Sequence, residues 1–381
     1  MPAIEDGAAE WFFDKDRHVK YWKRCLKTYL PTQYTSNDSN RMYLAYFMIS
    51  AFELLDILDS SISDEERAGY RDWIYHCQHP NGGFRMWPGT DFGDRANDEN
   101  AKWDPAHVPA TYFALTTLLT LGDDLSRVKR SEALQWLCTM QRSDGSFGET
   151  RVDGHIEGGN DPRFGYCAAG CRYILLGQRS QSPDRDDIDL SALTRSIKIS
   201  QLKAGNHPPV EIDALTRWLA DRQTDLVDPD GSLDSEFVSK LSAMPTDESA
   251  AYQSAEASLL HPALQMPDPN VAAGMNGRLN KVADTCYCWW VGASLDMLGQ
   301  GDLVNKPALR RYLLQLTQHP FMGGFCKFPD DKYADIYHSF MGLAALSLAS
   351  TAEERAEDGI KEWDAEMCIS KDVKRWITSS S

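Results

Sequence analysis

The stretch from Leu309 to Ala349 contains LRRYLLQLTQ (Leu309–Gln318), MGGF (Met322–Phe325) and IYHSFMGLAALSLA (Ile336–Ala349). Apolar residues recur at the i, i+3, i+4 and i+7 positions of the first and third segments, a spacing that predicts two helices. The first segment is mixed in polarity, whereas the third is almost entirely apolar and rich in small residues. A partly solvated outer helix packed on a buried inner helix would give this contrast.

The same order of segments, a mixed helix ending in Gln, a Gly-containing loop and an apolar helix, occurs twice earlier in the chain and is therefore an internal repeat. One copy runs from DWIYHCQ (Asp72–Gln78) to ATYFALTTLLTLG (Ala110–Gly122), the other from ALQWLCTMQ (Ala133–Gln141) to FGYCAAGCRYILLG (Phe164–Gly177). Glycines follow each Gln and are typical of a helix stop. The repeat predicts an all-α fold, an α/α toroid of the six-fold type, although superhelical scaffolds are built from the same pairs.

The middle of the chain breaks the repeat. Outer helices are predicted to end at Gln201 (DLSALTRSIKISQ) and at Gln223 (DALTRWLADRQ), so an inner helix is missing after Gln201. Residues 224–273 are acidic and rich in Ser, Ala and Pro, which predicts a low-complexity insertion. Within it, ESAAYQSAEASLL (Glu248–Leu260) is an alternative, degenerate inner helix.

Composition limits the class of protein. The chain has 381 residues, 42% of them hydrophobic, a formal net charge of −17 and nine cysteines. Such acidity argues against nucleic-acid binding, and the odd number of cysteines favours the reducing cytoplasm over a disulfide framework. No apolar run approaches the roughly 20 residues of a membrane span, and the first ten residues lack a signal-peptide pattern. We predict a single domain, 1–381, with a loop insertion at 85–109, the insertion at 224–273 and a C-terminal tail at 351–381.

Three residues of the types that bind zinc stand at the starts of predicted inner helices, namely Asp284, Cys286 and the distant His338. Singly, each is most simply a helix cap, a core thiol or a buried imidazole. Together, three protein ligands would leave the fourth tetrahedral position of a catalytic zinc open. A zinc ion of this kind can hold a substrate thiol as a thiolate.

Cations and aromatic residues surround this trio in the sequence. Arg278 and Lys281 precede it, Tyr287 follows Cys286, and Lys327 lies in the loop before His338, which suggests a cradle for an anion. Aromatic residues also lie on the predicted inner helices: Tyr43, Tyr46, Phe47, Tyr166, Trp289, Trp290, Tyr337 and Phe340. Zinc for a thiol, cations for a phosphate and aromatic rings for a hydrocarbon together suggest S-alkylation by an isoprenoid diphosphate.

Five motifs identify a family: GRLNKVADTCYCWW (Gly277–Trp290), GGFCKF (Gly323–Phe328), YHSFMGLAALSL (Tyr337–Leu348), RFGYCAA (Arg163–Ala169) and LGDDLSRV (Leu121–Val128). They resemble the β subunit of protein prenyltransferases, and most of all the type I geranylgeranyltransferases of filamentous fungi. The resemblance implies one catalytic zinc and a heterodimer with a helical-repeat α subunit. It also implies transfer of a C20 isoprenoid from geranylgeranyl diphosphate to the Cys of C-terminal Cys-a-a-X (CaaX) motifs, with X usually Leu. Rho-type GTPases would be among the substrates.

The resemblance also assigns roles to individual residues. Asp284, Cys286 and His338 match the zinc ligands. Positions near the diphosphate are matched by Arg163, Arg278, Lys281, Tyr287 and Lys327, of which Lys281, Tyr287 and Lys327 are expected to be catalytic. Positions around the isoprenoid and the peptide are matched by Tyr43, Phe47, Tyr166, Cys167, Trp290 and Tyr337.

Lys327 distinguishes between branches of this family. Farnesyltransferases resemble one another in having a magnesium-binding Asp at this position, whereas type I geranylgeranyl enzymes have a Lys. A fixed ammonium group can neutralise diphosphate charge without a metal. The resemblance therefore implies transfer that does not require Mg²⁺.

Other positions leave alternatives open. Tyr43 stands where type I enzymes have a small Thr, and Tyr337 stands where farnesyltransferases also have Tyr. These residues are compatible with a farnesyltransferase-like enzyme or with dual C15 and C20 specificity. The missing inner helix is compatible with a truncated, inactive form that binds lipid or the α subunit. A terpene cyclase would need an acidic motif at an inner-helix mouth, and DDLS (Asp123–Ser126) is not placed there.

Overall fold

The computed structural model describes residues 12–176, 187–189, 212–225, 271–279, 281–329 and 331–379. These fall into two compact units. The first comprises Met1–Arg24 and Asp213–Glu366, and the second comprises Cys25–Ile212 and Met367–Ser381. The predicted helix ending at Gln201, the alternative helix at 248–260 and most of the 224–273 insertion lie outside the described residues.

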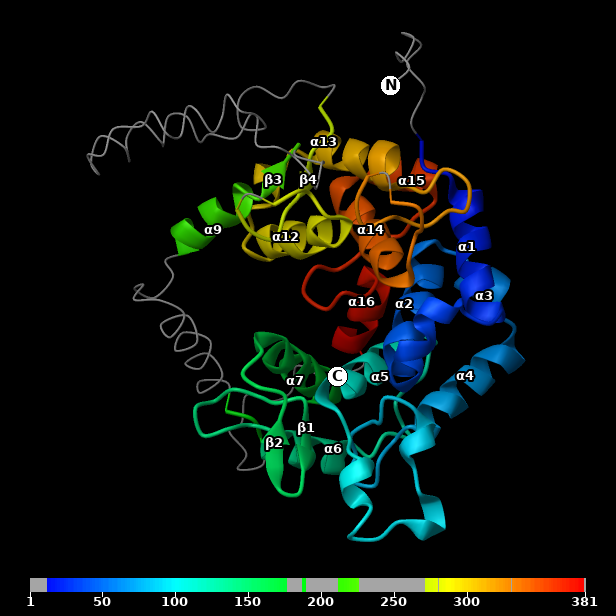
Figure 1. The fold of residues 1–381 in the computed structure, drawn as a ribbon, viewed down its shortest axis with the longest axis vertical. Helices are drawn as coiled ribbons and strands as arrows, with labels where there is room; N and C mark the ends of the chain where they lie inside the picture. Colours follow the sequence, from blue (N-terminus) through cyan, green and yellow to red (C-terminus); the bar gives the residue numbers. More distant parts are fainter. Residues whose placement is uncertain are drawn as a thin grey trace, which may run out of the picture. The chain divides into compact units, whose positions relative to one another are not determined.

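In the second unit, three apolar helices pack in a row: α2 (Arg41–Leu54), α5 (Val108–Thr120) and α7 (Pro162–Leu176), with α5 in contact with both of the others (Figure 1). Of the 13 residues of α5, 12 are buried. The threonine hydroxyls of this helix donate to carbonyls one turn back, which satisfies them inside the core. These are the predicted inner helices.

The outer helices of this unit have mixed surfaces, as the repeat predicted. Helix α4 (Asp64–His76) starts with a capping box, in which the Ser63 hydroxyl accepts from the Glu66 N–H and the Glu66 carboxylate accepts from the Ser63 N–H. It buries Ile74 and Tyr75 and leaves its polar side in solvent. Helix α6 (Arg130–Thr139) is its counterpart in the next repeat. Shorter elements precede them, η1 (Thr32–Asn40) and α3 (Leu58–Ser61).

In the first unit, α12 (Thr285–Met297) packs along α14 (Ile336–Ala349) (Figure 1). The outer helix of this repeat is α13 (Lys306–Arg311), which continues as a π-helix, η7 (Tyr312–Thr317). The unit also contains most of α1 (Lys15–Lys27), together with α9 (Ile212–Ala220), the 3₁₀ turn η6 (Gly301–Leu303) and α15 (Ala352–Asp358). Strands β3 (Gln223–Thr224) and β4 (Gly274–Met275) are antiparallel and pair Gln223 with Met275.

The glycines of the repeat do not act as helix stops, so that interpretation is wrong. Helices α4 and α6 end before the Gln, and each Gln forms an isolated β-bridge with a Phe across the loop: Gln78 with Phe84, Gln141 with Phe147, and Gln318 with Phe325. Between the partners the chain reverses at glycines such as Gly82 and Gly145, with φ of 93° and 88°. Only glycine adopts this backbone readily, so the repeated glycines serve the turn that closes the bridge.

The 85–109 insertion is a loop with three short 3₁₀ turns, η2 (Pro88–Thr90), η3 (Gly93–Arg95) and η4 (Ala101–Trp103). A hairpin of β1 (Thr150–Val152) and β2 (His155–Glu157) precedes α7 and pairs Arg151 with Ile156. Both additions lie just before an inner helix begins.

Part of the C-terminal tail is buried, although helix α15 (Ala352–Asp358) buries none of its own residues. Helix α15 ends at Gly359, and Trp363 beyond it is buried against Phe340 in the first unit. In the second unit the hydroxyls of Tyr46 and Tyr112 donate to the carbonyls of Cys368 and Met367, ahead of α16 (Lys371–Ser379). All nine cysteines are free. None of the helices in the described ranges has the length and apolar character needed to cross a bilayer.

Candidate functional site

Two of the predicted ligands come from the start of one inner helix and the third from the start of its neighbour. Asp284 is the N-cap of α12, and its Oδ1 accepts from the Cys286 N–H at 2.9 Å. His338 lies in the first turn of α14. Because α12 and α14 pack together, one ligand atom from each of Asp284, Cys286 and His338 lies within 4.8 Å of the other two. The structure therefore brings the predicted trio together.

A second carboxylate orients the imidazole. Asp335, the N-cap of α14, accepts from the His338 N–H through Oδ1 at 2.9 Å and contacts His338 Nδ1 through Oδ2 at 2.6 Å. This leaves His338 Nε2 facing Asp284 Oδ1 at 3.5 Å. Carboxylate–histidine pairs of this kind fix the ring that ligates a metal. Asp335 was not predicted from the sequence, although an Asp three residues before a helical His is a readable N-cap signal.

The Cys286 thiol is buried among polar groups. Burial raises its pKa well above the usual range, and the Asp284 carboxylate adds to the effect, while a hydrogen bond with Tyr337 opposes it. The Tyr337 hydroxyl also accepts from Trp290 Nε1 at 2.9 Å. Trp290 and Tyr287 remain 41% and 38% exposed, although Trp289 between them in α12 is 1% exposed. Of the predicted aromatic residues in the first unit, Trp290 and Tyr337 lie at this site, and Trp289 and Phe340 are core.

The predicted cations lie at different places around Asp284, Cys286 and His338. Lys327 Nζ lies 3.9 Å from Asp284 Oδ2, and the carbonyl of Lys327 accepts from the Thr285 N–H at the start of α12. Arg278 and Lys281 are exposed on the loop before α12. The Asn276 side chain ties this loop by donating to the Lys281 carbonyl at 2.9 Å. A Cβ on Gly277 would lie 2.1 Å from the Tyr287 ring, so any larger residue there would displace this ring.

The donor set fits a zinc ion. A carboxylate oxygen, a thiol sulfur and an imidazole nitrogen are all zinc donors, and three of them leave one position for a substrate. The thiol must lose its proton to ligate. Because Asp335 Oδ2 accepts a hydrogen bond from His338 Nδ1, the other ring nitrogen, Nε2, is the one left to face the metal.

The predicted isoprenoid and peptide residues Tyr43, Phe47, Tyr166 and Cys167 belong to the second unit. The Tyr43 ring packs edge-on against Phe113 with 4.9 Å between centroids, and Phe47 lies 6.2 Å from the same ring. Tyr166 is 40% exposed, and its hydroxyl lies 3.1 Å from that of Tyr112. Burial raises the pKa of Cys167 to about 12, so this thiol stays neutral.

Arg163 already has an anionic partner in its own loop. Its guanidinium forms a bidentate pair with Asp161, donating from Nη2 to Oδ2 at 2.6 Å and from Nε to Oδ1 at 3.0 Å, and this pairing lowers the pKa of the Asp161 carboxyl. The Arg163 side chain is nevertheless 80% exposed. Glu149 lies 3.8 Å from His107 Nδ1 and contributes, after burial, to the raised pKa of Tyr43. Neither Asp161 nor Glu149 was singled out from the sequence.

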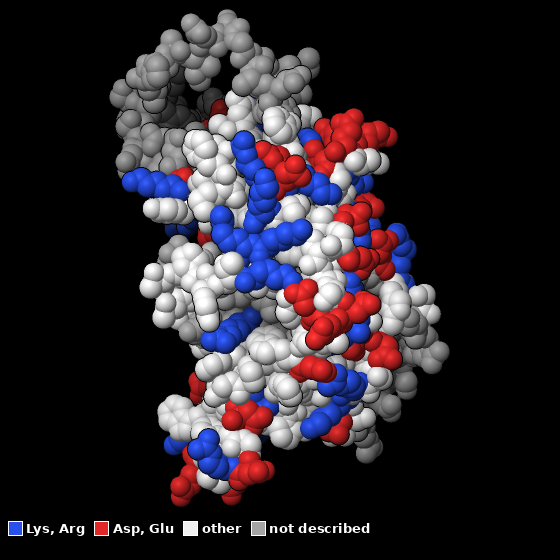
Figure 2. Space-filling view, turned by 90° about the vertical axis from the view of Figure 1, so that its right-hand side faces the viewer, with Lys and Arg blue, Asp and Glu red and all other residues white. Residues whose placement is uncertain are grey.

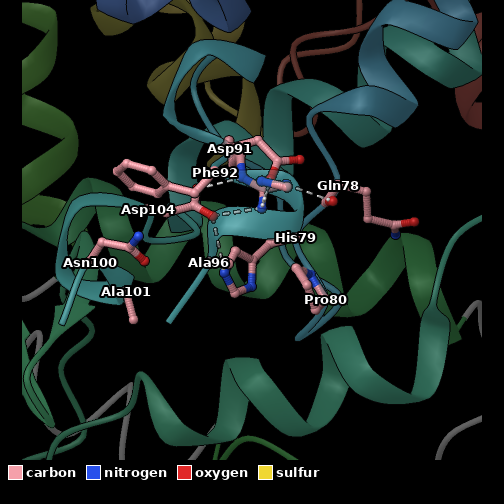
Figure 3. Close-up of a pocket in the computed structure, with 11 residues that line it drawn as sticks. Gln78, His79, Pro80, Asp91, Phe92, Ala96, Asn100, Ala101 and Asp104 are labelled. Atoms are coloured by element: carbon pink, nitrogen blue, oxygen red, sulfur yellow. Dashed lines mark hydrogen bonds and ion pairs between the residues drawn. The ribbon is translucent and has the colours of Figure 1, made fainter. Parts of the chain in front are cut away.

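A cavity of about 290 Å³ lies in the 85–109 loop, and none of the predicted site residues lines it (Figure 3). Arg85 is 3% exposed and is held by Asp104 through bonds from Nε and Nη2 at 2.5 and 2.7 Å. A third bond runs from Nη1 to the carbonyl of Gln78. The guanidinium and the carboxylate thus satisfy each other, as buried charges require. The bonds of Arg85 to Asp104 and Gln78 hold the loop in place, and the cavity contributes no residue to the candidate site.

Comparison with known proteins identifies the family of this chain. A family model described as the prenyltransferase alpha-alpha toroid domain matches residues 13–206 and 198–369. The chain is 31% identical over 349 residues to the geranylgeranyl transferase type-1 subunit beta of Arabidopsis thaliana, covering 88% of this chain and 85% of that one.

Other relatives lie on both branches of the family. The Dictyostelium discoideum geranylgeranyl transferase type-1 subunit beta is 28% identical, covering 88% of this chain and 91% of that one. The protein farnesyltransferase subunit beta of Schizosaccharomyces pombe is also 28% identical, covering 88% and 78%. A solved structure, Candida albicans protein geranylgeranyltransferase-I complexed with GGPP, has the same fold with a TM-score of 0.70 and 24% identity, covering 96% of this chain and 98% of that one. The chain belongs to the prenyltransferase α/α-toroid family.

Proposed function

We propose that the chain is the catalytic β subunit of a type I protein geranylgeranyltransferase. It would transfer the C20 group of geranylgeranyl diphosphate to the Cys of a C-terminal Cys-a-a-X motif, usually with X = Leu, as a thioether. The partner would be a prenyltransferase α subunit, and the substrates would include Rho-type GTPases. The observation that best supports this proposal is the cluster of Asp284, Cys286 and His338, with the Lys327 ammonium 3.9 Å from Asp284.

The metal and the cations have separate tasks. When bound by Asp284, Cys286 and His338, zinc supplies the positive charge that holds a substrate thiol as thiolate at neutral pH. Asp335 keeps the His338 ring oriented for this role. Lys327 stands beside the trio, where its fixed charge would stabilise the diphosphate as it leaves. Arg278 and Lys281, on the loop before α12, and Tyr287, in its first turn, would bind the same anion, with no requirement for Mg²⁺.

Arg163 would contribute to anion binding by exchanging Asp161 for a phosphate oxygen. Both partners are exposed enough to separate, and an exposed ion pair contributes only about 1 kcal/mol or less. The cost of the exchange is therefore small. Tyr43, Phe47, Tyr166, Cys167, Trp290 and Tyr337 would supply contacts to the isoprenoid and to the peptide.

The test is prenyl transfer by this chain co-expressed with a prenyltransferase α subunit, using a Cys-a-a-Leu peptide, C20 diphosphate and zinc without added magnesium. We expect a thioether product, detected by mass spectrometry. Cys286→Ser should lose both metal and activity. Cys288→Ser is the matched control, because Cys288 lies on the same helix, is fully buried and donates to the Asp284 carbonyl without belonging to the trio. No transfer by a well-folded heterodimer would instead support an inactive lipid- or subunit-binding form.

A second candidate is a farnesyltransferase-like or dual-specificity enzyme. The observation that favours it is the bulk of Tyr43, whose ring packs edge-on against Phe113 at a position matched to the lipid. Equal or faster transfer from C15 diphosphate in the same assay would select this candidate.

A further inference from the structure

Helix α1 has a charge opposite to that of the chain. Six of its 13 residues are Lys or Arg and one, Asp16, is acidic, whereas the whole chain has a net charge of −17. The helix buries His18, Tyr21 and Trp22 and exposes Arg17, Lys20, Lys23 and Arg24. Figure 2 shows Lys and Arg atoms gathered in the middle of the face on which α1 lies. Within the described part of the chain, Lys20 and Lys23 form no ion pair.

Large apolar side chains stand in solvent next to this helix. Phe12, just before α1, is 65% exposed, and Phe321 and Met322, on the loop after η7, are 84% and 45% exposed. Tyr333, on the segment that leads to α14, is 70% exposed. We call these four side chains the apolar tips. All of them belong to the first unit, as do Arg17 to Arg24.

Hydrogen bonds hold the tips in a defined arrangement beside α1. Gln318 donates from Nε2 to the Phe12 carbonyl at 3.0 Å and accepts from the Asp14 N–H at 3.2 Å. Arg17 donates to the carbonyl of Pro320, the residue before Phe321. The apolar tips at Phe12 and Phe321 are therefore linked to each other and to the basic helix.

His319 links the segment that contains Tyr333 to the loop that contains Phe321 and Met322. His319 Nδ1 accepts from the N–H groups of Phe321 and Met322 at 3.2 and 3.1 Å. The proton then lies on Nε2, which contacts the carbonyl of Lys332 at 3.3 Å. The Lys332 side chain and the next residue, Tyr333, are exposed. The surface thus combines fixed apolar tips with exposed basic groups.

We propose that the apolar tips and the basic face of α1 form a docking surface for an anionic lipid bilayer. Basic side chains near an anionic headgroup layer are attracted to it, and apolar side chains can enter the boundary with the acyl chains. The remainder of the acidic chain does not prevent this, because exposed charges more than about 8 Å away are largely screened at physiological salt.

The pattern fits a bilayer better than a protein partner. Lys is depleted in protein interfaces, and a protein would need a complementary pocket for each of several separate tips. A fluid bilayer admits each tip without such a pocket. The proposal does not depend on the prenyl-transfer reaction.

The test is co-sedimentation of the full chain with vesicles of phosphatidylcholine alone or of equimolar phosphatidylcholine and phosphatidylserine. We expect the chain to sediment with the anionic vesicles and to be released at high salt. Lys20→Glu with Lys23→Glu should lower the partition coefficient at least about tenfold, since each lysine near the surface contributes roughly a fivefold factor. Phe321→Ser with Met322→Ser should weaken binding to anionic vesicles without changing the salt dependence.

Matched controls are Lys129→Glu and Trp103→Ser, which alter an exposed lysine and a 66% exposed aromatic residue of the second unit. Both should bind like the unaltered chain. Equal binding to the two kinds of vesicle, or equal losses in the controls, would overturn the proposal. It would also be overturned if pairing with an α subunit abolished vesicle binding and the Lys20→Glu, Lys23→Glu chain bound that subunit more weakly. That outcome would assign the surface to the partner protein.

Discussion

The Oδ2 atom of Asp335 lies 2.6 Å from Nδ1 of His338, and Oδ1 of the same carboxylate caps α14 by accepting from the His338 N–H. One side chain therefore starts the helix and also orients the imidazole that faces Asp284. The two roles are separable by substitution, because an amide can cap a helix but is a weaker acceptor for an imidazole N–H.

We expect Asp335→Asn to keep the stability of α14 and to lower zinc affinity by about 10- to 100-fold. Asp335→Ala should lose the same affinity and also about 1 kcal/mol of unfolding free energy, because it removes the cap. The measurements are competition with a zinc chelator and urea unfolding. If Asp335→Asn bound zinc as tightly as the unaltered chain, the orienting role would be wrong.

Lys327 provides a test of metal-independent transfer. We expect the unaltered enzyme to show no rate increase on addition of Mg²⁺. Lys327→Ala should lower the chemical rate by about 10- to 100-fold, since it removes one charge-assisted contact to the leaving group. Lys327→Asp should be slow without magnesium and partly restored by it. Single-turnover rates across a magnesium titration provide the measurement, and strong stimulation of the unaltered enzyme would contradict the prediction.

Tyr43 is expected to limit the length of the isoprenoid. Tyr43→Thr should raise the ratio of C20 to C15 transfer, because removing the ring that packs on Phe113 opens space for a fourth isoprene unit. Tyr43→Phe is the control, since it keeps the ring and removes only the hydroxyl. Competition between the two diphosphates measures the ratio directly. The same ratio in all three proteins would show that Tyr43 does not set chain length.

The buried His18 ring is expected to stabilise the first unit at neutral pH and to lose this contribution in acid. The ring is fully buried, accepts from the Gly324 N–H through Nδ1 and contacts Gln318 Oε1 through Nε2. Burial lowers its pKa from 6.5 to about 4, against the opposing effect of the bond with Gln318. A lowered folded-state pKa means that the contribution to stability is present above pH 6.5 and is lost as the pH falls toward 4.

The expected loss over this range is about 3 kcal/mol of unfolding free energy. His18→Gln should be less stable than the unaltered chain at pH 7, and the difference should shrink by pH 5. The exposed His76 supplies the control, His76→Gln, which should leave the pH dependence unchanged. A difference between the His18→Gln and unaltered chains that stays constant with pH would contradict the assignment.

Local patterns in the sequence were sufficient for the helix pairs. The near-complete burial of α5 and the half-polar surface of α4 follow from periodicity and composition, which act within a few turns of chain. The repeat also placed Asp284, Cys286 and His338 at helix starts. The role of the glycines was misread because a helix stop and a tight β-bridge turn both use glycine, and only the pairing of Gln78 with Phe84 distinguishes them.

The roles of residues that depend on a partner distant in the sequence were harder to predict from the sequence. The alternation of Trp289 and Trp290 between core and site depends on which side of α12 meets α14. The pairing of Phe12 with the loop at Phe321 joins opposite ends of the sequence. Arg163 could be recognised as a cation, but its engagement by Asp161 depends on the conformation of the loop before α7.

The sequence by itself determined an all-α repeat and the chemical types of the site residues, because helix periodicity, capping and side-chain chemistry are properties of short segments. Tertiary structure decided that Asp284, Cys286 and His338 converge within 4.8 Å. It also decided that Asp335 orients His338 through α14 and that a basic helix lies beside exposed apolar tips. These relationships arise when buried helices pack and force distant segments into contact, and no local interaction specifies them.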